Sequence, residues 1–281
     1  MSRRSRERQL AKLAARRAAE RRRRARRRQL VAGVALGVLA LAAGIAFLAG
    51  GSGGGRPRAT GTPSPSASPG ARTGSVTPEP APRRVACGAE APSSAGEPKP
   101  QYAGPPPEVI DPARRYTAII ETSCGEIVVR LLADRAPQTV NSFVFLAREG
   151  FFDGTYVHRL DPSIDVIQAG DPTGTGNGGP GYTIPDELTG GEEYGPGTVA
   201  MANRGPDTAG SQFFIVAGPG GHRLDEAPAY TIFGRVVRGM DVAARILALP
   251  VQDPEAARAG DLSAQRPKLA VYLERVLVRE R

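Results

Sequence analysis

The chain contains few of the residues that carry most enzyme chemistry. Its 281 residues include two histidines and two cysteines, spread along the sequence, so there is no cluster with the ligand spacing of a zinc site. There is no G-x-S-x-G motif, and neither His158 nor His222 stands in a recognisable catalytic-triad pattern. Nucleophilic catalysis is therefore poorly supported, and we expect no zinc site.

A glycine-rich run at residues 170–181, GDPTGTGNGGPG, has the general appearance of a phosphate-binding loop. It lacks the Gly-Lys-Ser/Thr ending, whose lysine and hydroxyl contact phosphate and Mg²⁺ in such loops. We therefore interpret the run as a series of turns.

Positive charge is concentrated at the N-terminal end. Residues 1–28 carry fourteen Lys or Arg and two Glu, a net charge of +12, whereas the whole chain carries +9 and the remainder therefore −3. The basic character thus belongs to a tail, residues 1–29. Such a tail can bind nucleic acid, but beside an apolar segment it is explained more simply by membrane orientation and contact with anionic lipid, so we expect no nucleic-acid partner.

The basic tail is followed by 21 residues, 30–50, without a charged side chain. At about 1.5 Å per residue this length matches the roughly 30 Å hydrocarbon core of a bilayer, which predicts a transmembrane helix. The positive-inside rule then places the N-terminus in the cytoplasm and the C-terminal bulk across the membrane. A cleaved signal peptide is the main alternative, but its apolar region would be only about 7 to 15 residues long.

Residues 51–113 consist mainly of Gly, Pro, Ser, Thr and Ala, with almost no large apolar side chains. Such a composition cannot bury enough surface to offset chain entropy, so we expect a disordered, locally extended linker. Cys87 lies near its end, and Cys124 is the other cysteine of the chain. In an oxidising compartment the two could form a disulfide bond that attaches the linker to the domain; two free thiols are the alternative.

Residues 114–281 are enough for a single domain with a substantial core. Helices are expected at 138–148, after Pro137, and at 240–247, after Gly239. Alternating apolar residues predict strands at 116–121, 126–132, 155–160, 166–169, 197–202, 212–217, 231–237 and 270–278. Many short strands with glycine-rich turns are typical of a mainly β fold, here a closed eight-stranded antiparallel barrel capped by two helices.

In the stretch AMANRGPDTAGSQFFIV, residues 200–216, a polar centre separates two strand-like pieces. Because neighbouring side chains of a strand point to opposite faces, Gln212 and Phe214 share one face while Phe213 lies on the other. An amide beside an aromatic ring is typical of a lined groove. An ordinary half-buried strand is the alternative.

Five segments between residues 115 and 280 carry a more specific signal. They are APQTVNSFVFLAREGFFDGT (136–155), VHRL (157–160), VIQAGDPTGTGNGGPG (166–181), TVAMANRGPDTAGSQFFIV (198–216) and FGRVVRG (233–239). In this order and spacing they resemble the cyclophilins, which are peptidyl-prolyl cis-trans isomerases. The resemblance implies a cyclophilin-like barrel that acts on proline-containing polypeptides without metal or cofactor.

The resemblance also implies roles for individual residues. Arg159 matches the family's catalytic arginine, Gln168 matches a glutamine that positions it, and Asn203 matches a residue that hydrogen-bonds the substrate backbone. The substrate-binding residues implied in the same way are His158, Val166, Ala202, Gln212, Phe214, Leu224 and Tyr230. Among these, Val166, Phe214 and Leu224 would form an apolar wall around the proline ring, and His158 is as compatible with a supporting role as with a direct one.

One departure from the family's pattern lies in the proline pocket. The segment between Arg159 and Val166 has one residue more than the usual spacing, and Asp165 aligns where the family has a phenylalanine. A carboxylate that lines an apolar pocket is costly unless it is paired or turned away. Either a loop shift lets Ile164 fill that space or the pocket is altered, and the second case favours a catalytically weak peptide-binding or chaperone module.

The order of tail, span and linker before the domain is similar to that of membrane-anchored cyclophilins of bacteria. We therefore expect a single-pass protein of the cell membrane, with a cytoplasmic N-terminus and an extracytoplasmic catalytic domain. Its substrates would be unfolded or newly exported chains, and it would act as a monomer.

Overall fold

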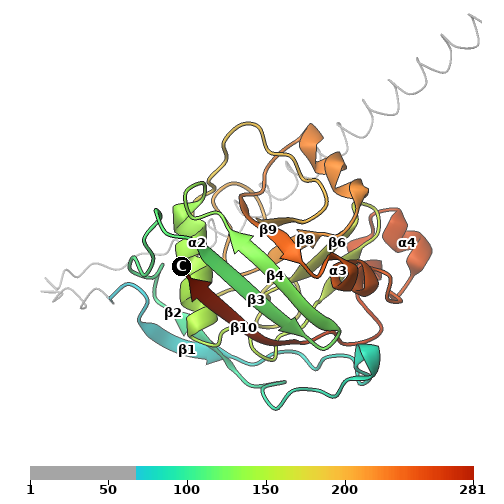
Figure 1. Cartoon of the computed structure of the whole chain (residues 1–281). Coiled ribbons are helices and arrows are strands. Elements are labelled where there is room, and N and C mark those ends of the chain that lie inside the picture. Colours follow the sequence, from blue (N-terminus) through green and yellow to red (C-terminus); the bar gives the residue numbers. More distant parts are fainter. Residues whose placement is uncertain (1–67) are drawn as a thin grey trace, which may run out of the picture. The chain divides into compact units, whose positions relative to one another are not determined.

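The structure, a computed structural model, describes residues 68–281, which form an eight-stranded antiparallel sheet with short helices around it (Figure 1). The strand order is β10-β3-β4-β9-β7-β8-β6-β5. The strands are β3 (Tyr116–Thr122), β4 (Gly125–Leu131), β5 (Arg159–Asp161), β6 (Val166–Ala169), β7 (Thr198–Met201), β8 (Phe213–Val216), β9 (Ile232–Arg238) and β10 (Leu273–Glu280). Each overlaps one of the eight strands predicted from alternation, so the mainly β class is confirmed.

The two strands at the ends of this order, β5 and β10, are not paired with each other as strands. The segment before β5 is joined to the start of β10 through a bridge between Tyr156 and Tyr272 and through three backbone hydrogen bonds: from the Gly154 N–H to the Leu273 carbonyl (2.7 Å), from the Leu273 N–H to the Thr155 carbonyl (2.8 Å) and from the Val157 N–H to the Val271 carbonyl (2.9 Å). The expected closed barrel is thus corrected to a curled sheet whose edges meet through these few bonds and not through a continuous strand ladder. The reason is that β5 has only three residues, too few to continue the ladder across.

Both predicted helices are confirmed, as α2 (Pro137–Arg148) and α3 (Met240–Leu247). A third helix, α4 (Pro254–Arg258), was not predicted, because five residues are too few to show an apolar period. It begins where the Asp253 side chain accepts hydrogen bonds from the backbone N–H groups of Glu255 and Ala256. Figure 1 shows α2 at one side of the sheet and α3 with α4 at the opposite side.

The centre of the main core is a group of phenylalanine rings between α2 and the sheet. The ring centroid of Phe143 on α2 lies 5.1 Å from that of Phe152, 5.6 Å from that of Phe213 and 5.2 Å from that of Phe233. Such pairs add about 0.5–1.5 kcal/mol each to the free energy of burial. The inward orientation predicted for Phe213 is confirmed, since it is buried in this cluster.

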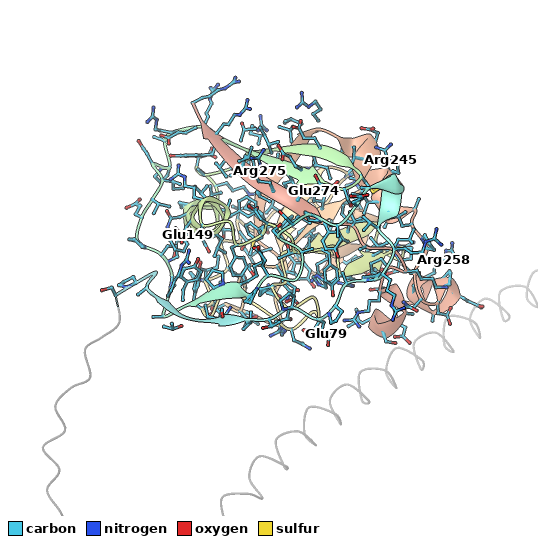
Figure 2. All side chains as sticks on the ribbon, turned by 90° about the horizontal axis from the view of Figure 1, so that it is seen from below. Glu79, Glu149, Arg245, Arg258, Glu274 and Arg275 are labelled. Carbon is cyan, nitrogen blue, oxygen red and sulfur yellow. A yellow bond between two sulfur atoms is a disulfide. The ribbon has the colours of Figure 1, made fainter. Side chains whose placement is uncertain are left out.

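Residues 68–113 differ from the expected disordered linker. They carry β1 (Arg72–Val76), the 3-10 helix η1 (Ala86–Gly88) and β2 (Lys99–Tyr102), and β1 pairs with β2 in an antiparallel two-stranded sheet. We call residues 68–113 the N-terminal extension. Figure 2 shows Glu79 of this extension on the opposite side of the domain from Arg275 of β10.

The N-terminal extension is held on the domain by buried side chains as well as by its backbone. The Tyr102 ring lies edge-on to Phe145 of α2 at 5.1 Å, and Lys99, only 4% exposed, donates from Nζ to the Asp153 carbonyl. Gly154 adopts a positive φ of 73°, and a Cβ there would come within 2.2 Å of the Ser94 carbonyl oxygen. The extension therefore fits closely against the domain, and the linker prediction is corrected for these residues.

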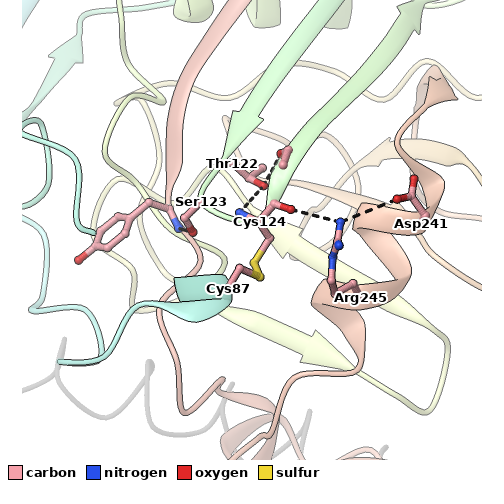
Figure 3. Close-up of a disulfide and its surroundings, with 8 residues drawn as sticks. Cys87, Thr122, Ser123, Cys124, Asp241 and Arg245 are labelled. Carbon is pink, nitrogen blue, oxygen red and sulfur yellow. Dashed lines mark hydrogen bonds and ion pairs between the residues drawn. A yellow bond between two sulfur atoms is a disulfide. The ribbon is translucent and has the colours of Figure 1, made fainter. Parts of the chain in front are cut away.

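A disulfide bond joins Cys87 of η1 to Cys124 in the turn between β3 and β4 (Figure 3). Of the two alternatives left by the sequence, the bond is confirmed. The Cys124 carbonyl also accepts a hydrogen bond of 3.3 Å from Arg245 of α3, and Arg245 is paired with Asp241 at 3.8 Å. The bond thus attaches the extension at the point where α3 meets the β3–β4 turn.

Candidate functional site

Arg159 lies on β5, directly opposite Gln168 of β6 in the strand register. Its Nη1 donates to Gln168 Oε1 at 2.9 Å, its Nε donates to Gln265 Oε1 at 2.6 Å, and its Nη2 is paired with Asp161 Oδ2 at 2.5 Å. The side chain of Arg159 is 27% exposed. Three separate groups therefore fix the guanidinium in one orientation while part of it still faces solvent.

Sequence reasoning found the first of these partners but missed the other two. Gln265 belongs to the 3-10 helix η3 (Leu262–Gln265), 106 residues away in sequence, and is fully buried. Its Nε2 donates to the Ala257 carbonyl at 3.2 Å, which anchors it to α4. No motif surrounds Gln265. Asp161, which is two residues from Arg159 on the same strand face, could have been found from β periodicity.

Gln168 and Gln212 continue the network toward the glycine-rich run. Gln168 Nε2 donates to Gln212 Oε1 at 2.9 Å, and Gln212 Nε2 donates to the carbonyls of Gly176 and Gly178 at 3.0 and 2.9 Å. The buried Asp171 carboxylate accepts the N–H groups of these same two glycines, at 2.5 and 3.2 Å. The run is thus a set of turns closed on a carboxylate, as interpreted from the sequence.

Asn203 and Ala202 follow β7. The Ala202 N–H donates to the Gln212 carbonyl at 2.9 Å, so this backbone runs beside that of Gln212. Asn203 Nδ2 donates to the Ala229 carbonyl at 2.6 Å. Both residues line a cavity of about 150 Å³ with Gln168 and Gln212. The predicted contact of Asn203 with substrate backbone stays a prediction.

A second, smaller apolar cluster lies beside this polar network. Val166 and Phe214 are buried in it, and Leu224 and Tyr230 pack against it while partly exposed. The Phe214 and Tyr230 rings meet edge to face with centroids 5.3 Å apart. The structure therefore brings together the residues expected to form an apolar wall.

Asp165 is turned away from this cluster. It adopts a positive φ of 52°, and its Oδ2 accepts the Gly220 N–H at 2.7 Å in the 3-10 helix η2 (Pro219–Glu226). Ile164 packs against the apolar cluster instead. The loop shift, rather than an altered pocket, is the alternative that the geometry supports. Arg223, also in η2, donates to the Ser163 carbonyl and holds the same loop.

His158 is 6% exposed and lies next to Arg159. Burial lowers the pKa of His158 to about 4, against the opposing effect of the Asp171 carboxylate. The imidazole is therefore neutral at pH 7. Its ring nitrogens make no hydrogen bond of ordinary length among residues 68–281, while the nearby Gln212 side chain acts to raise its pKa, so both the supporting and the direct role of His158 stay predictions.

The fold and the site together define a peptide-groove domain: a fixed arginine, two linked glutamines and an apolar wall. Sequence comparison gives the same class, since residues 117–276 match the family "Cyclophilin type peptidyl-prolyl cis-trans isomerase/CLD". The chain belongs to this family and is a cyclophilin-type peptidyl-prolyl cis-trans isomerase.

Individual relatives agree with this assignment. The chain is 44% identical over 145 residues to peptidyl-prolyl cis-trans isomerase-like 1 of Mus musculus, covering 50% of this chain and 83% of the relative. It is 45% identical over 131 residues to peptidyl-prolyl cis-trans isomerase ppi1 of Schizosaccharomyces pombe, covering 45% and 82%. A Cryptosporidium parvum cyclophilin-type isomerase, also solved in the presence of the dipeptide Ala-Pro, is similar in structure. Two solved structures of this isomerase each have a TM-score of 0.50 at 25% identity, and the matches cover 59% and 58% of this chain and 98% of each solved chain.

These comparisons correct the predicted location. The relatives are eukaryotic isomerases, which overturns the predicted location in a cell membrane with an extracytoplasmic domain and gives no support to a membrane-anchored bacterial group. In the part of the chain that the structure covers, no helix has the length and apolar character needed to cross a bilayer. The span expected at 30–50 and the basic tail at 1–29 lie outside the described residues. The membrane location is therefore wrong, and the comparisons give no support to a membrane partner or to exported substrates.

Proposed function

We propose that the chain accelerates rotation about X-Pro bonds of unfolded polypeptides without a covalent intermediate, with Arg159 as the catalytic residue. Rotation must break amide resonance, a barrier of about 18–20 kcal/mol. In the twisted transition state the prolyl nitrogen loses conjugation and becomes a better hydrogen-bond acceptor. A donor that is better placed for this state than for either planar isomer lowers the barrier.

The observation that carries this proposal is the hydrogen-bond count of the Arg159 guanidinium. A guanidinium has five N–H donors, and Gln168, Gln265 and Asp161 engage one each. Two N–H groups, one on each Nη atom, are left for a substrate. Because the other three are fixed, little reorganisation is needed when the charge distribution of the substrate changes.

The apolar cluster beside the arginine supports the same function. In this proposal a proline ring packs on the edge of the cluster, where Leu224 is partly exposed over the buried Val166 and Phe214, and burial of that ring favours binding by about 25 cal/mol per Å². The catalytically weak binding module was favoured by a carboxylate in this pocket. Asp165 is turned away and bonded to Gly220, so that argument no longer applies.

Exchange NMR spectroscopy on an Ala-Ala-Pro-Ala peptide with the full-length protein tests the proposal. Arg159→Ala is expected to lower kcat/KM by about 10²- to 10³-fold, the usual effect of removing one preorganised donor. Arg159→Lys keeps the charge but loses the planar arrangement of several N–H donors, and is expected to retain only part of the rate. Arg275→Ala on β10, on the far side of the domain from Glu79, is the control (Figure 2). Equal rates for Arg159→Ala and the unsubstituted protein would refute the role of Arg159.

A further inference from the structure

A cavity of about 840 Å³ lies directly beside Arg159, on the side of η3 and the N-terminal extension. Its lining includes Glu79, His158, Arg159, Arg204, Leu262 and Arg266. It is several times larger than the 150 Å³ cavity beside Gln212. Glu79 lies outside residues 117–276, so part of the wall is built by a segment beyond the matched family domain.

Backbone and side-chain bonds fix the wall that Glu79 contributes. The Glu79 N–H donates to the Thr173 carbonyl at 2.8 Å, and its carboxylate pairs with Arg266 at 2.8 Å. Arg266 also donates to the Gly174 carbonyl at 3.2 Å. The extension, the glycine-rich run and the segment after η3 therefore meet at one rim of the cavity.

The charge on this lining is positive. Three guanidinium groups, those of Arg159, Arg204 and Arg266, face one carboxylate, that of Glu79. Arg159 is balanced by Asp161, and Arg266 by Glu79. Arg204 donates to the Gly176 carbonyl at 3.1 Å and is paired with no carboxylate within residues 68–281.

The pair of Glu79 and Arg266 is easily exchanged. Its side chains are 52% and 47% exposed, and exposed pairs contribute only about 0–1 kcal/mol. A carboxylate from a bound molecule can therefore take the place of Glu79 on Arg266 at small cost.

Two other side chains of the lining can contact a molecule bound in the cavity. His158 is buried, and both of its ring nitrogens are without a hydrogen-bond partner among the described residues, although a buried polar group normally has one. Leu262, at 67% exposure, is one of three large apolar side chains that are exposed in the described part of the chain.

We propose that this cavity is a second substrate subsite, which binds an acidic side chain near the isomerising X-Pro bond through Arg204 and Arg266, with Leu262 against its aliphatic part. The proposal rests on the proposed function, since it takes the X-Pro bond to lie at Arg159. It assigns to the N-terminal extension a part in substrate selection, because Glu79 competes with the substrate carboxylate for Arg266.

The test is a set of Ala-Pro peptides with a single Glu, Gln or Lys at each position up to three residues before or after the X-Pro bond. The kcat/KM of the full-length protein is measured by exchange NMR spectroscopy at low salt. At one position or more, the kcat/KM of the Glu peptide is expected to exceed that of the Lys peptide by about fivefold. The Glu side chain gains two exposed charge contacts, with Arg204 and Arg266, whereas a Lys side chain is repelled by both. This ratio is expected to shrink at about 1 M salt, where the Debye length is about 3 Å.

Variants separate the subsite from a general effect on the fold. Arg204→Gln and Arg266→Gln are each expected to lower the Glu-to-Lys ratio by about two- to fivefold, whereas Glu79→Gln is expected to raise it. Arg275→Gln, on β10, should leave the ratio unchanged. If the Gln peptides show catalysis, the subsite would be overturned by a Glu-to-Lys ratio near one in the unsubstituted protein. It would also be overturned by a ratio that Arg204→Gln and Arg266→Gln leave unchanged. Absence of acceleration with every peptide would overturn the proposed function, and the subsite with it.

Discussion

Removal of the disulfide bond is expected to lower stability strongly without unfolding the domain. The perturbation is the double substitution Cys87→Ser and Cys124→Ser. The bond closes a loop with a sequence separation of 37 residues. In the chain-entropy description, a loop of this length restricts the unfolded state by about 4 kcal/mol at 25 °C. For a domain of this size each kcal/mol corresponds to roughly 2–4 °C, so the expected loss in Tm is about 8–16 °C.

The structure also indicates why the fold should survive this change. Tyr102 and Lys99 hold the N-terminal extension independently of the disulfide, through a ring contact with Phe145 and a bond to the Asp153 carbonyl. The N–H of Ala86 donates to the Ala270 carbonyl at 2.8 Å, right beside Cys87. The double variant is therefore expected to keep its isomerase rate at 25 °C.

Calorimetry at pH 7, with and without reductant, measures the effect. Reductant should shift the Tm of the unsubstituted protein toward that of the double variant and should leave the variant itself unchanged. The reasoning fails if the double variant melts within about 2 °C of the unsubstituted protein, because the loop would then contribute no restriction to the unfolded state.

Three further predictions concern single residues. Burial lowers the pKa of His158 to about 4, below the value of about 6.5 in an unfolded chain. Below pH 6.5 the unfolded chain therefore takes up a proton on His158 that the folded protein does not, and the free energy of unfolding is expected to fall by about 3 kcal/mol as the pH decreases to 4. Urea unfolding of His158→Gln should lack this slope. Gln265→Met removes the acceptor for Arg159 Nε and is expected to lower kcat about tenfold with KM retained, which corresponds to about 1.4 kcal/mol. Gln265→Glu keeps an acceptor oxygen and should recover part of the lost kcat. Asp165→Ala loses the hydrogen bond to Gly220 and puts alanine at a positive φ, so it is expected to lower the free energy of unfolding by about 1–2 kcal/mol, measured with urea. Asp165→Asn should lower it less, since Asn tolerates this backbone conformation.

Each of these has a contradicting result. A pH slope that persists in His158→Gln would assign the acid sensitivity to another group. A Gln265→Met variant with a normal kcat but a raised KM would mean that Gln265 supports binding and not the orientation of Arg159. Equal stabilities of Asp165→Ala and Asp165→Asn would remove the argument from the left-handed backbone.

Local patterns predicted the parts of the fold that depend on local chemistry. Alternation in β8 placed Phe213 in the core, which is confirmed, and put Phe214 on the opposite face, where it is buried in the second apolar cluster; its contact with substrate stays a prediction. The predicted closure of the barrel was wrong. Closure depends on how the edge strands β5 and β10 meet, and local patterns do not determine this because the two strands are far apart in sequence. The partners of Arg159 divide similarly: Gln168 lies opposite it in a β hairpin, whereas Gln265 arrives from a segment 106 residues away.

The N-terminal extension shows most clearly what a composition argument measures. Residues 68–113 have too few large apolar side chains to form a core of their own, and from this we predicted disorder. The inference holds only for a segment that must fold alone. Here Tyr102 adds its ring to the existing cluster at Phe145 and Tyr182, at 5.1 and 6.4 Å, so one buried side chain gains a core that other residues have already built. Backbone bonds to the glycine-rich run and the disulfide bond supply the rest. Low hydrophobicity therefore excludes an independent domain but does not exclude an extension that docks on one, and in this chain the docked segment supplies Glu79 to the cavity beside Arg159.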